Sequence, residues 1–244
     1  MDRAARAAGE QARMSYFRES GFAALGSDLP RQTAPREWIV WHFTHSANLP
    51  GIVKSGHLYA STKQDPLVNV ASYVVKARRR RIRVCPDESY PEGKSVADHV
   101  PFYIAAKSPM LYAVTKGHLD YDGGCESLVF LGLPIGSIVD SGIIWCASDA
   151  NAATDFVQFT RNVELLGSFV DFDLLCEQIW KGTPGDPNRS SRRAAEVLVL
   201  DQLPIDMITH VVARTGETLD PARSALESVG GTRQYRTEKD FYYD

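Results

Sequence analysis

A single glutamate, Glu196, stands between an arginine-rich segment and an apolar run in the stretch "SSRRAAEVLVLDQLP", residues 190–204. A carboxylate that is buried without a partner is costly, so a fold either exposes it or pairs it. Glu196 therefore either begins an edge strand and faces water, or is held at a cleft where it can do chemistry. Composition alone favours the exposed edge strand, because glutamate is rarely buried.

Two histidines, His42 and His45, lie in the aromatic stretch "WHFTH". On a strand, His42 and Thr44 share one face and His45 lies on the other. No acidic or cysteine ligand stands at zinc spacing, so we predict no metal site. The pattern is equally consistent with histidines that the backbone holds in the core and with histidines at a ligand site.

Six basic residues fall between Lys76 and Arg83. Such a cluster is most often the solvated face of a helix. Two functional alternatives remain: arginine forks grip the pyrophosphate of a dinucleotide, and a local basic strip attracts a nucleic-acid backbone. Aromatic residues nearby belong either to the core or to a surface that stacks on a base: Tyr73, Phe102, Tyr103 and Tyr112.

The sequence pattern predicts short strands mixed with short helices, without regular βαβ alternation, and this indicates an α+β fold. Hydrophobic and β-branched runs predict strands at 38–45, 101–105, 128–131, 142–146, 196–200, 208–214 and near 233–236. Helices are predicted after Ser46, ending at Gly56, in the first part of the basic segment, and from Met110. We divide the chain into an N-terminal extension, 1–36, and one domain, 37–244.

The bulk composition restricts the function only coarsely. The 244 residues are 44% hydrophobic with a net charge of −3, so nucleic-acid binding would require a local basic patch. Four widely spaced cysteines without a C-x-x-C pair predict reduced thiols. No apolar run has the length of a signal peptide core or a membrane span, so we expect a soluble, cytoplasmic protein, and a monomer.

Five blocks, in this order, resemble the DarT family of DNA ADP-ribosyltransferase toxins. They are "HFTHSANLPGIVKSGHL", "KARRRRIRV", "VADHVPFYIAAKSPMLY", "ASDANAA" and "RRAAEVLVLDQLP", and together they cover roughly residues 38–212. The resemblance implies an ADP-ribosyltransferase-like fold, with two antiparallel sheets packed face to face, flanking helices and NAD⁺ in the cleft between the sheets.

The resemblance also implies an activity. The protein would be a toxin that transfers ADP-ribose from NAD⁺ onto a base of single-stranded DNA, thymine or guanine, with a macrodomain antitoxin as partner. Alternatives are an ADP-ribosyltransferase that acts on RNA, protein or water, and a non-catalytic nucleic-acid-binding module.

Site residues are carried over by position. Glu196 matches the catalytic glutamate, and Arg78 is our choice for the catalytic, NAD⁺-contacting arginine, with Arg79 or Arg80 as alternative registers. The other predicted NAD⁺ contacts are His42, Phe43, Thr44, Asn48 and Gly51. Predicted DNA contacts are Arg79, Arg80, Lys107, Asn151, Arg192 and Arg193. The chain departs from the family pattern at His99, Ala106, Lys107 and Ala150, which leaves the preferred base and sequence open.

Overall fold

The computed structural model describes residues 23–24, 34–117 and 120–244. Its strands are β1 (Ala23–Ala24), β2 (Trp38–His45), β3 (His57–Tyr59), β4 (His99–Tyr103), β5 (Leu128–Pro134), β6 (Trp145–Ser148), β7 (Phe159–Thr160), β8 (Glu196–Leu200), β9 (Gln202–Pro204), β10 (His210–Ala213) and β11 (Gln234–Thr237). Its α-helices are α2 (Leu49–Ser55), α3 (Tyr73–Arg79), α4 (Pro109–Thr115), α5 (Ile135–Asp140), α6 (Leu166–Phe169), α7 (Phe172–Cys176), α8 (Arg189–Arg192) and α9 (Gly216–Leu226). This mixture confirms the predicted α+β class.

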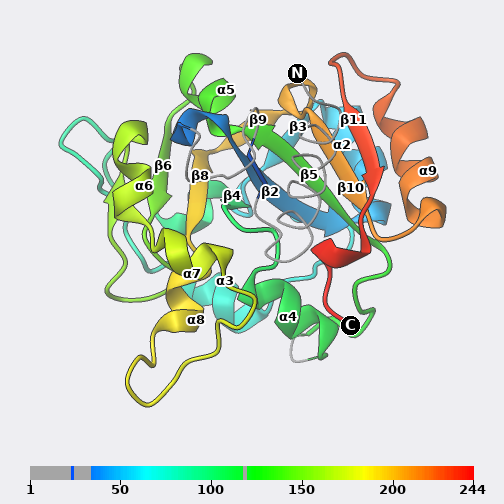
Figure 1. Cartoon of the computed structure of the whole chain (residues 1–244). Helices are drawn as coiled ribbons and strands as arrows, with labels where there is room; N and C mark the ends of the chain where they lie inside the picture. The colour runs from blue at the N-terminus through cyan, green and yellow to red at the C-terminus, as the bar shows by residue number, and fades with distance from the viewer. Residues whose placement is uncertain (1–22, 25–33, 118–119) are drawn as a thin grey trace, which may run out of the picture.

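Most strands belong to one large sheet, in the order β11-β10-β5-β2-β4-β8-β6-β7, with β1 also pairing with β2 (Figure 1). Among the described residues, its neighbouring strands are antiparallel except β10 and β11, which are parallel. Strands β3 and β9 form a separate two-stranded sheet. Strand β2 pairs with β5 at seven positions but with β4 only where Trp41 faces Tyr103. The large sheet therefore consists of two halves that meet at one residue pair.

The narrow junction between β2 and β4 follows from the neighbours of both strands. Because β5 occupies one edge of β2, β1 pairs with the other edge, at Trp38 and Ile39, and takes the place that β4 would continue into. Beyond Trp41, β4 presents Pro101, which has no N–H to donate to a ladder. The two strands part there.

Local sequence explains the strand and helix boundaries well. The run at 38–45 forms β2 as predicted, with Trp38–Trp41 fully buried. Helix α2 ends at Gly56, whose φ of +73° is the left-handed conformation that glycine adopts readily. Ser46, however, is not the helix N-cap: a 3₁₀ turn, Ser46–Asn48, comes first, and Asn48 precedes the helix.

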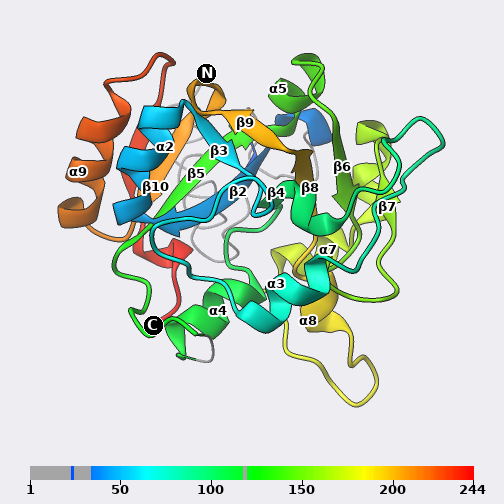
Figure 2. The same ribbon diagram turned by 180° about the vertical axis from the view of Figure 1, so that it is seen from behind.

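Helices cover the sheet unevenly. Helices α2 and α9 contact each other, and α9 packs on β10 and β11 at one side of the molecule. Helices α3, α4, α7 and α8 gather beyond one end of β4 and β8, as the two opposite views show (Figures 1 and 2). The first residue of β8, Glu196, lies at that end.

Most of the predicted N-terminal extension, residues 1–22 and 25–33, lies outside the described residues. Within the extension, Ala23 and Ala24 add strand β1 to the sheet, and residues 34–36 are also described. The boundary at residue 36 stays a prediction. None of the helices in the described ranges is long and apolar enough to cross a membrane.

Candidate active site

The carboxylate of Glu196 is buried and held by three hydrogen bonds. Its side chain is 1% exposed. Arg79 donates from Nη1 to both carboxylate oxygens at 3.0 Å, and the backbone N–H of Ala152 donates to Oε1 at 3.1 Å. These donors compensate the lost hydration of the charge. The edge-strand interpretation of Glu196 is therefore wrong: the residue begins a strand between β4 and β6 and points into the protein.

A tight turn after β6 brings the Ala152 N–H to the carboxylate. The Ser148 hydroxyl donates to the Ala150 carbonyl at 2.7 Å and accepts from the Glu196 N–H at 3.1 Å. The turn residues Ala150, Ala152 and Ala153 are small and buried, so the backbone can approach the glutamate closely. The "SDANAA" stretch thus serves to bind Glu196 through its backbone.

Arg79 is the last residue of α3, a helix that Ser72 caps by accepting from the Val74 N–H at 3.2 Å. Its side chain is 13% exposed, and its Nη2 is buried without a hydrogen-bond partner among the described residues. Arg78, one residue earlier, is exposed and is not among the hydrogen-bond donors to the glutamate. The arginine that meets Glu196 is therefore the alternative register, Arg79.

Tyr103 lies opposite Glu196 on β4 and is a site residue that sequence reasoning assigned only to packing or stacking. Its hydroxyl donates to the Met110 sulfur at 3.2 Å. Burial, with the nearby Glu196 charge, raises the pKa of Tyr103, so its phenol stays protonated. The alternation of side chains along β4 could not indicate which aromatic residue would face the glutamate.

His42 lies at the junction of β2 and β4. Its Nδ1 is 2.9 Å from the Pro101 carbonyl, and its ring lies 5.7 Å from that of Phe102. Because a carbonyl only accepts, Nδ1 carries a proton. Burial lowers the pKa of His42, partly offset by this hydrogen bond. The imidazole is therefore neutral at pH 7, and its Nε2 is left as an acceptor.

The structure does not bring His42 into direct contact with Glu196. Residues opposite one another on antiparallel strands project to the same face, so Trp41, Tyr103 and Glu196 share one face of the sheet. His42, the next residue along β2, projects to the other face by alternation. Glu196 and His42 therefore lie on opposite faces of the sheet, near the β2–β4 junction.

Thr44 and Asn48 act together. Asn48 donates from Nδ2 to Thr44 Oγ1 and to the Val68 carbonyl, both at 2.9 Å, and its Oδ1 accepts from the Val68 N–H at 2.8 Å. These bonds use both amide hydrogens of Asn48. The asparagine thus ties β2 to the segment that leads into α3 and so helps to place Arg79.

Two other predicted NAD⁺ contacts have different surroundings. Phe43 is 6% exposed, and its ring packs against Tyr103 and Phe130 in the core. Gly51 lies exposed in α2, with nothing within 4 Å of the position of an added Cβ. Phe43 therefore belongs to the core, and the contact of either residue with NAD⁺ stays a prediction.

Two predicted DNA contacts have structural partners instead. Arg192 donates to Asp171 at 2.8 Å and to Asp186 at 2.9 and 2.7 Å, and these hydrogen bonds raise the pKa of its guanidinium. Arg193 is 1% exposed and donates to the carbonyls of Lys107, Leu174 and Leu175. Both guanidinium groups hold the segment that precedes Glu196, and their predicted contacts with DNA stay predictions.

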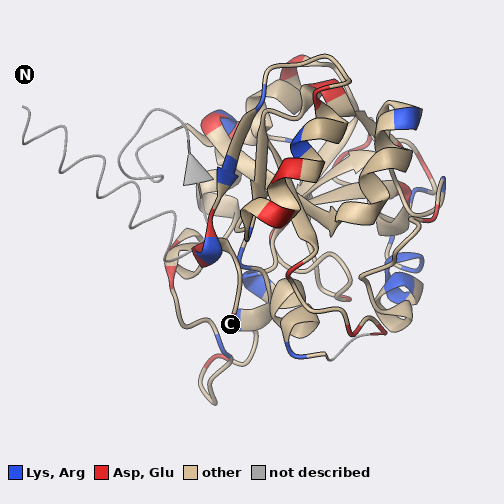
Figure 3. Ribbon diagram, turned by 90° about the vertical axis from the view of Figure 1, so that its right-hand side faces the viewer, with Lys and Arg blue, Asp and Glu red and all other residues tan. Residues whose placement is uncertain are grey.

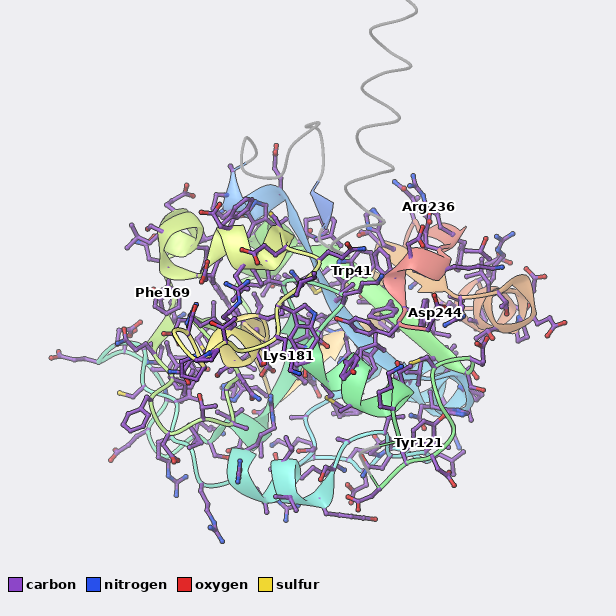
Figure 4. The ribbon with its side chains drawn as sticks, turned by 60° about the horizontal axis from the view of Figure 1, so that its bottom comes forward. Trp41, Tyr121, Phe169, Lys181, Arg236 and Asp244 are labelled. Carbon is purple, nitrogen blue, oxygen red and sulfur yellow. The ribbon has the colours of Figure 1, made fainter. Side chains whose placement is uncertain are left out.

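The remaining predicted DNA contacts are accessible to different degrees. Arg80 is exposed at the end of α3, and Asn151 is half-buried, with its side chain accepting from the Ala153 N–H at 2.9 Å. Lys107 is half-buried over the Tyr243 ring, and burial lowers its pKa. The Tyr243 hydroxyl donates to the Lys107 carbonyl at 3.0 Å and accepts from the Trp180 indole at 2.8 Å; Lys181 and Asp244, the next residues along the chain, are labelled in Figure 4.

The residues around Glu196 fit NAD⁺ as a substrate. The unpartnered Nη2 of Arg79 can donate to a phosphate or hydroxyl oxygen, and the carboxylate can interact with a positively charged sugar. Among the described residues, no three His, Cys, Asp or Glu side chains are grouped to hold a metal ion. The site around Glu196 therefore offers a carboxylate and a guanidinium, and the neutral imidazole of His42 lies across the β2–β4 junction from them.

Known proteins are similar to this chain in sequence and in fold. The family described as ssDNA thymidine ADP-ribosyltransferase, DarT, matches residues 41–243. A DNA ADP-ribosyl transferase of Mycobacterium tuberculosis (strain ATCC 25618 / H37Rv) is 50% identical over 228 residues, 93% of this chain and 98% of the relative. The structure of Thermus sp. 2.9 DarT in complex with ADP-ribosylated ssDNA has a TM-score of 0.78 and 25% identity, covering 86% of this chain and 98% of that one.

These findings define an NAD⁺-dependent ADP-ribosyltransferase fold and activity class. The chain belongs to the DarT family of DNA ADP-ribosyltransferases. The predicted family, ADP-ribosyltransferase fold, DNA-directed activity and use of NAD⁺ are confirmed. The predicted pair of antiparallel sheets is, in detail, one sheet whose halves meet at a single residue pair, with a small second sheet beside it.

Proposed function

We propose that this protein transfers ADP-ribose from NAD⁺ to thymidine in single-stranded DNA, with Glu196 and Arg79 as catalytic residues and His42 as an NAD⁺ contact. The observation that carries the proposal is the buried Glu196 carboxylate, bound by Arg79 and by the Ala152 N–H. The choice of thymidine rests on the family's description, and guanine is the alternative.

The geometry suits the chemistry of a glycosyl transfer. The bond between nicotinamide and ribose breaks with oxocarbenium character, as in other glycosyl transfers. A carboxylate fixed nearby stabilises that positive charge and can accept a hydrogen bond from the ribose. Glu196 is held in one position by its donors, so little reorganisation is needed when the charge develops.

Arg79 has two roles in this proposal. Through Nη1 it holds the glutamate in place, and through Nη2, which has no partner among the described residues, it donates to substrate oxygen. A thymine nitrogen is a poor nucleophile while protonated. As nicotinamide leaves, the Glu196 carboxylate takes up that proton, and the adjacent guanidinium stabilises the deprotonated base. A base that is paired in a duplex is not accessible, which favours single-stranded DNA.

His42 would accept a hydrogen bond from NAD⁺ at Nε2. Its Nδ1 proton is committed to the Pro101 carbonyl, which fixes the tautomer and the ring direction. Arg80, Lys107 and Asn151 remain proposed DNA contacts on the exposed side of the site.

The test is mass spectrometry of oligonucleotides that contain one thymidine or one guanosine, incubated with the protein and NAD⁺. We expect the thymidine strand to gain one ADP-ribosyl group and the same sequence in a duplex to remain unmodified. Glu196→Gln, which keeps the size of the side chain, should lower the rate by at least about a hundredfold, roughly 2.7 kcal/mol of barrier, with an unchanged circular dichroism spectrum. Equal activity of Glu196→Gln and wild type would refute the catalytic assignment.

Other acceptors are outcomes of the same assay. RNA or protein that becomes labelled in place of DNA would assign a different substrate, and free ADP-ribose alone would assign NAD⁺ hydrolysis. DNA binding with a steep salt dependence and no NAD⁺ consumption would indicate a non-catalytic module.

We also propose that the protein is a toxin whose partner is a macrodomain antitoxin that removes the DNA mark. A structural neighbour, Thermosipho africanus DarTG in complex with ADP-ribose, shares the fold at 14% identity and a TM-score of 0.62. Expression of the wild type, but not of Glu196→Gln, should stop bacterial growth, and co-expression of a macrodomain hydrolase should restore it. The expected monomeric state and cytoplasmic location stay predictions, to be checked by light scattering and by cell fractionation.

A further inference from the structure

A groove of about 490 Å³ opens between the segment that follows α3 and the segment that leads into β7. One wall carries Arg81, Arg83 and Cys85, and the other carries Asp155, Val157 and Phe159. Arg81 and Arg83 belong to the basic cluster between Lys76 and Arg83, and none of the six residues contacts Glu196.

Each wall of the groove follows closely in the sequence after a residue that binds the Glu196 carboxylate. Arg79 lies two residues before Arg81, and Ala152 lies three residues before Asp155. A chain of two or three residues spans at most about 10 Å. The nearest lining residue of each wall therefore lies within about 10 Å, along the backbone, of a residue that binds the carboxylate, which is within reach of a strand that has one base at the site.

The charge of the groove is predominantly positive. Arg78, Arg80, Arg81 and Arg83 are exposed, and none forms a salt bridge with another described residue. Arg83 donates from Nη1 to the Gly93 carbonyl at 2.7 Å, which fixes the direction of its side chain. Asp155 is the one acidic residue of the lining. Guanidinium groups free of carboxylate partners are suited to phosphate oxygens.

Phe156 stands at the edge of this groove, between two residues that line it, and its side chain is 94% exposed. It is the most exposed of the large hydrophobic residues in the described ranges. An exposed ring beside arginines is the combination that binds single strands: the ring stacks on a base and the arginines hold the backbone.

We propose that this groove is a subsite for the nucleotides that flank the modified base in single-stranded DNA. Arg81 and Arg83 bind backbone phosphates, and Phe156 stacks on a flanking base. The inference rests on the proposed function, because it assigns the path of the same DNA strand. It assigns residues that determine the affinity for DNA and the preference for flanking nucleotides but do not contact NAD⁺.

The first test compares two oligonucleotides with one thymidine each, of about three and about twelve nucleotides, since single-strand sites span about 4–16 nucleotides. Arg81→Gln/Arg83→Gln and Phe156→Ala should each lower kcat/KM for the longer strand at least about fivefold, the lower end of the stacking contribution of one base. Activity on the shorter strand and the KM for NAD⁺ should change less than about twofold. Phe156→Trp should retain activity on the longer strand.

Two control variants each remove an exposed arginine or an exposed apolar side chain that does not line the groove. Arg236→Gln removes an exposed arginine on β11, which lies beside α9 at the opposite side of the molecule from β7 (Figure 2). Leu165→Ala removes a large side chain that is 53% exposed. Neither should alter the dependence of activity on strand length. Equal losses for both strand lengths in the groove variants would overturn the proposal.

A second test needs no catalysis. Cys85 lines the groove and is exposed, whereas Cys125 and Cys146 are buried. In wild-type protein without NAD⁺, the longer strand should slow maleimide labelling of Cys85, measured by peptide mass spectrometry, and the shorter strand should not. Unchanged labelling at a saturating concentration of the longer strand would overturn the subsite. If no DNA of either length is modified, the proposed function fails, and protection of Cys85 still decides whether the groove binds DNA.

Discussion

The Glu196 carboxylate is almost completely removed from water, and its stability as an anion depends on the donors around it. The carboxylate accepts hydrogen bonds from a backbone N–H and from one guanidinium nitrogen. The second nitrogen of that guanidinium, Nη2 of Arg79, is buried and has no partner in the part of the chain that the structure describes. A guanidinium nitrogen without an acceptor is unfavourable in the free protein. We interpret this cost as the consequence of a site that is complete only when a substrate oxygen is present.

Arg78 and Arg79 form a matched pair for testing this interpretation. Arg79→Lys keeps the charge but loses the second nitrogen, so we expect kcat/KM for DNA modification to fall at least about tenfold, which is about 1.4 kcal/mol of barrier. Arg78→Lys, on the exposed neighbour, should change it less than about threefold. Initial rates by chromatography of the modified strand measure both. A larger loss for the Arg78 variant would instead support Arg78, the residue chosen from the sequence, as the catalytic arginine.

At the scale of elements, the site depends on how β2 packs between its neighbours. The Trp41 ring lies across Gly132 of β5, so close that an added Cβ would be 2.5 Å from the nearest ring carbon. The same ring contacts Phe241 edge-on at 4.9 Å. Gly132 thus makes room for the indole, and Trp41 in turn is the residue of β2 that pairs with β4, next to His42.

Gly132→Ala tests this packing. We expect the free energy of unfolding to fall by about 1–3 kcal/mol, because the extra methyl group forces a ring in a filled core to move. Gly167→Ala in α6 is the control: nothing lies within 4 Å of the added carbon, so it should be neutral or stabilise by up to about 1 kcal/mol. Urea denaturation measures both. Equal stabilities of the two variants would contradict the close contact seen at Gly132.

For the whole molecule, charge and protonation are unevenly distributed. The net charge is only −3, and residues of both signs are interspersed on the side that carries α9 and β11 (Figure 3). The basic residues after α3 are therefore a local feature. Inside the molecule, burial lowers the pKa of His99 and of His210 to about 4 each, and also lowers that of His42.

These histidines predict that the protein loses stability in mild acid. Their folded pKa values lie below the unfolded value of about 6.5, so between pH 6.5 and 4 the unfolded chain binds more protons, and acid favours unfolding. For His99, which is 2% exposed, we expect about 1–2 kcal/mol lower free energy of unfolding at pH 5 than at pH 7. Urea titrations at several pH values measure this, and His99→Asn should flatten the pH dependence. A stability that is constant or rises toward pH 5 would contradict it.

The sequence by itself determined the features that depend on neighbouring residues. Alternation and β-branched runs located β2, β5 and β8, and Gly56 ended α2, because these signals act over a few residues. The order of five motifs identified the family and predicted Glu196 as its catalytic glutamate. Motif order needs no knowledge of which side chains meet.

Only the tertiary structure decided which side chains meet. Arg79 rather than Arg78 reaches Glu196, because the direction of a side chain at the end of α3 depends on how Asn48 anchors the segment before the helix. Arg192 and Arg193 look like free cations in the sequence, yet their partners come from residues up to 86 positions away. Contacts between distant segments follow from how the core packs, and a local pattern does not contain that information.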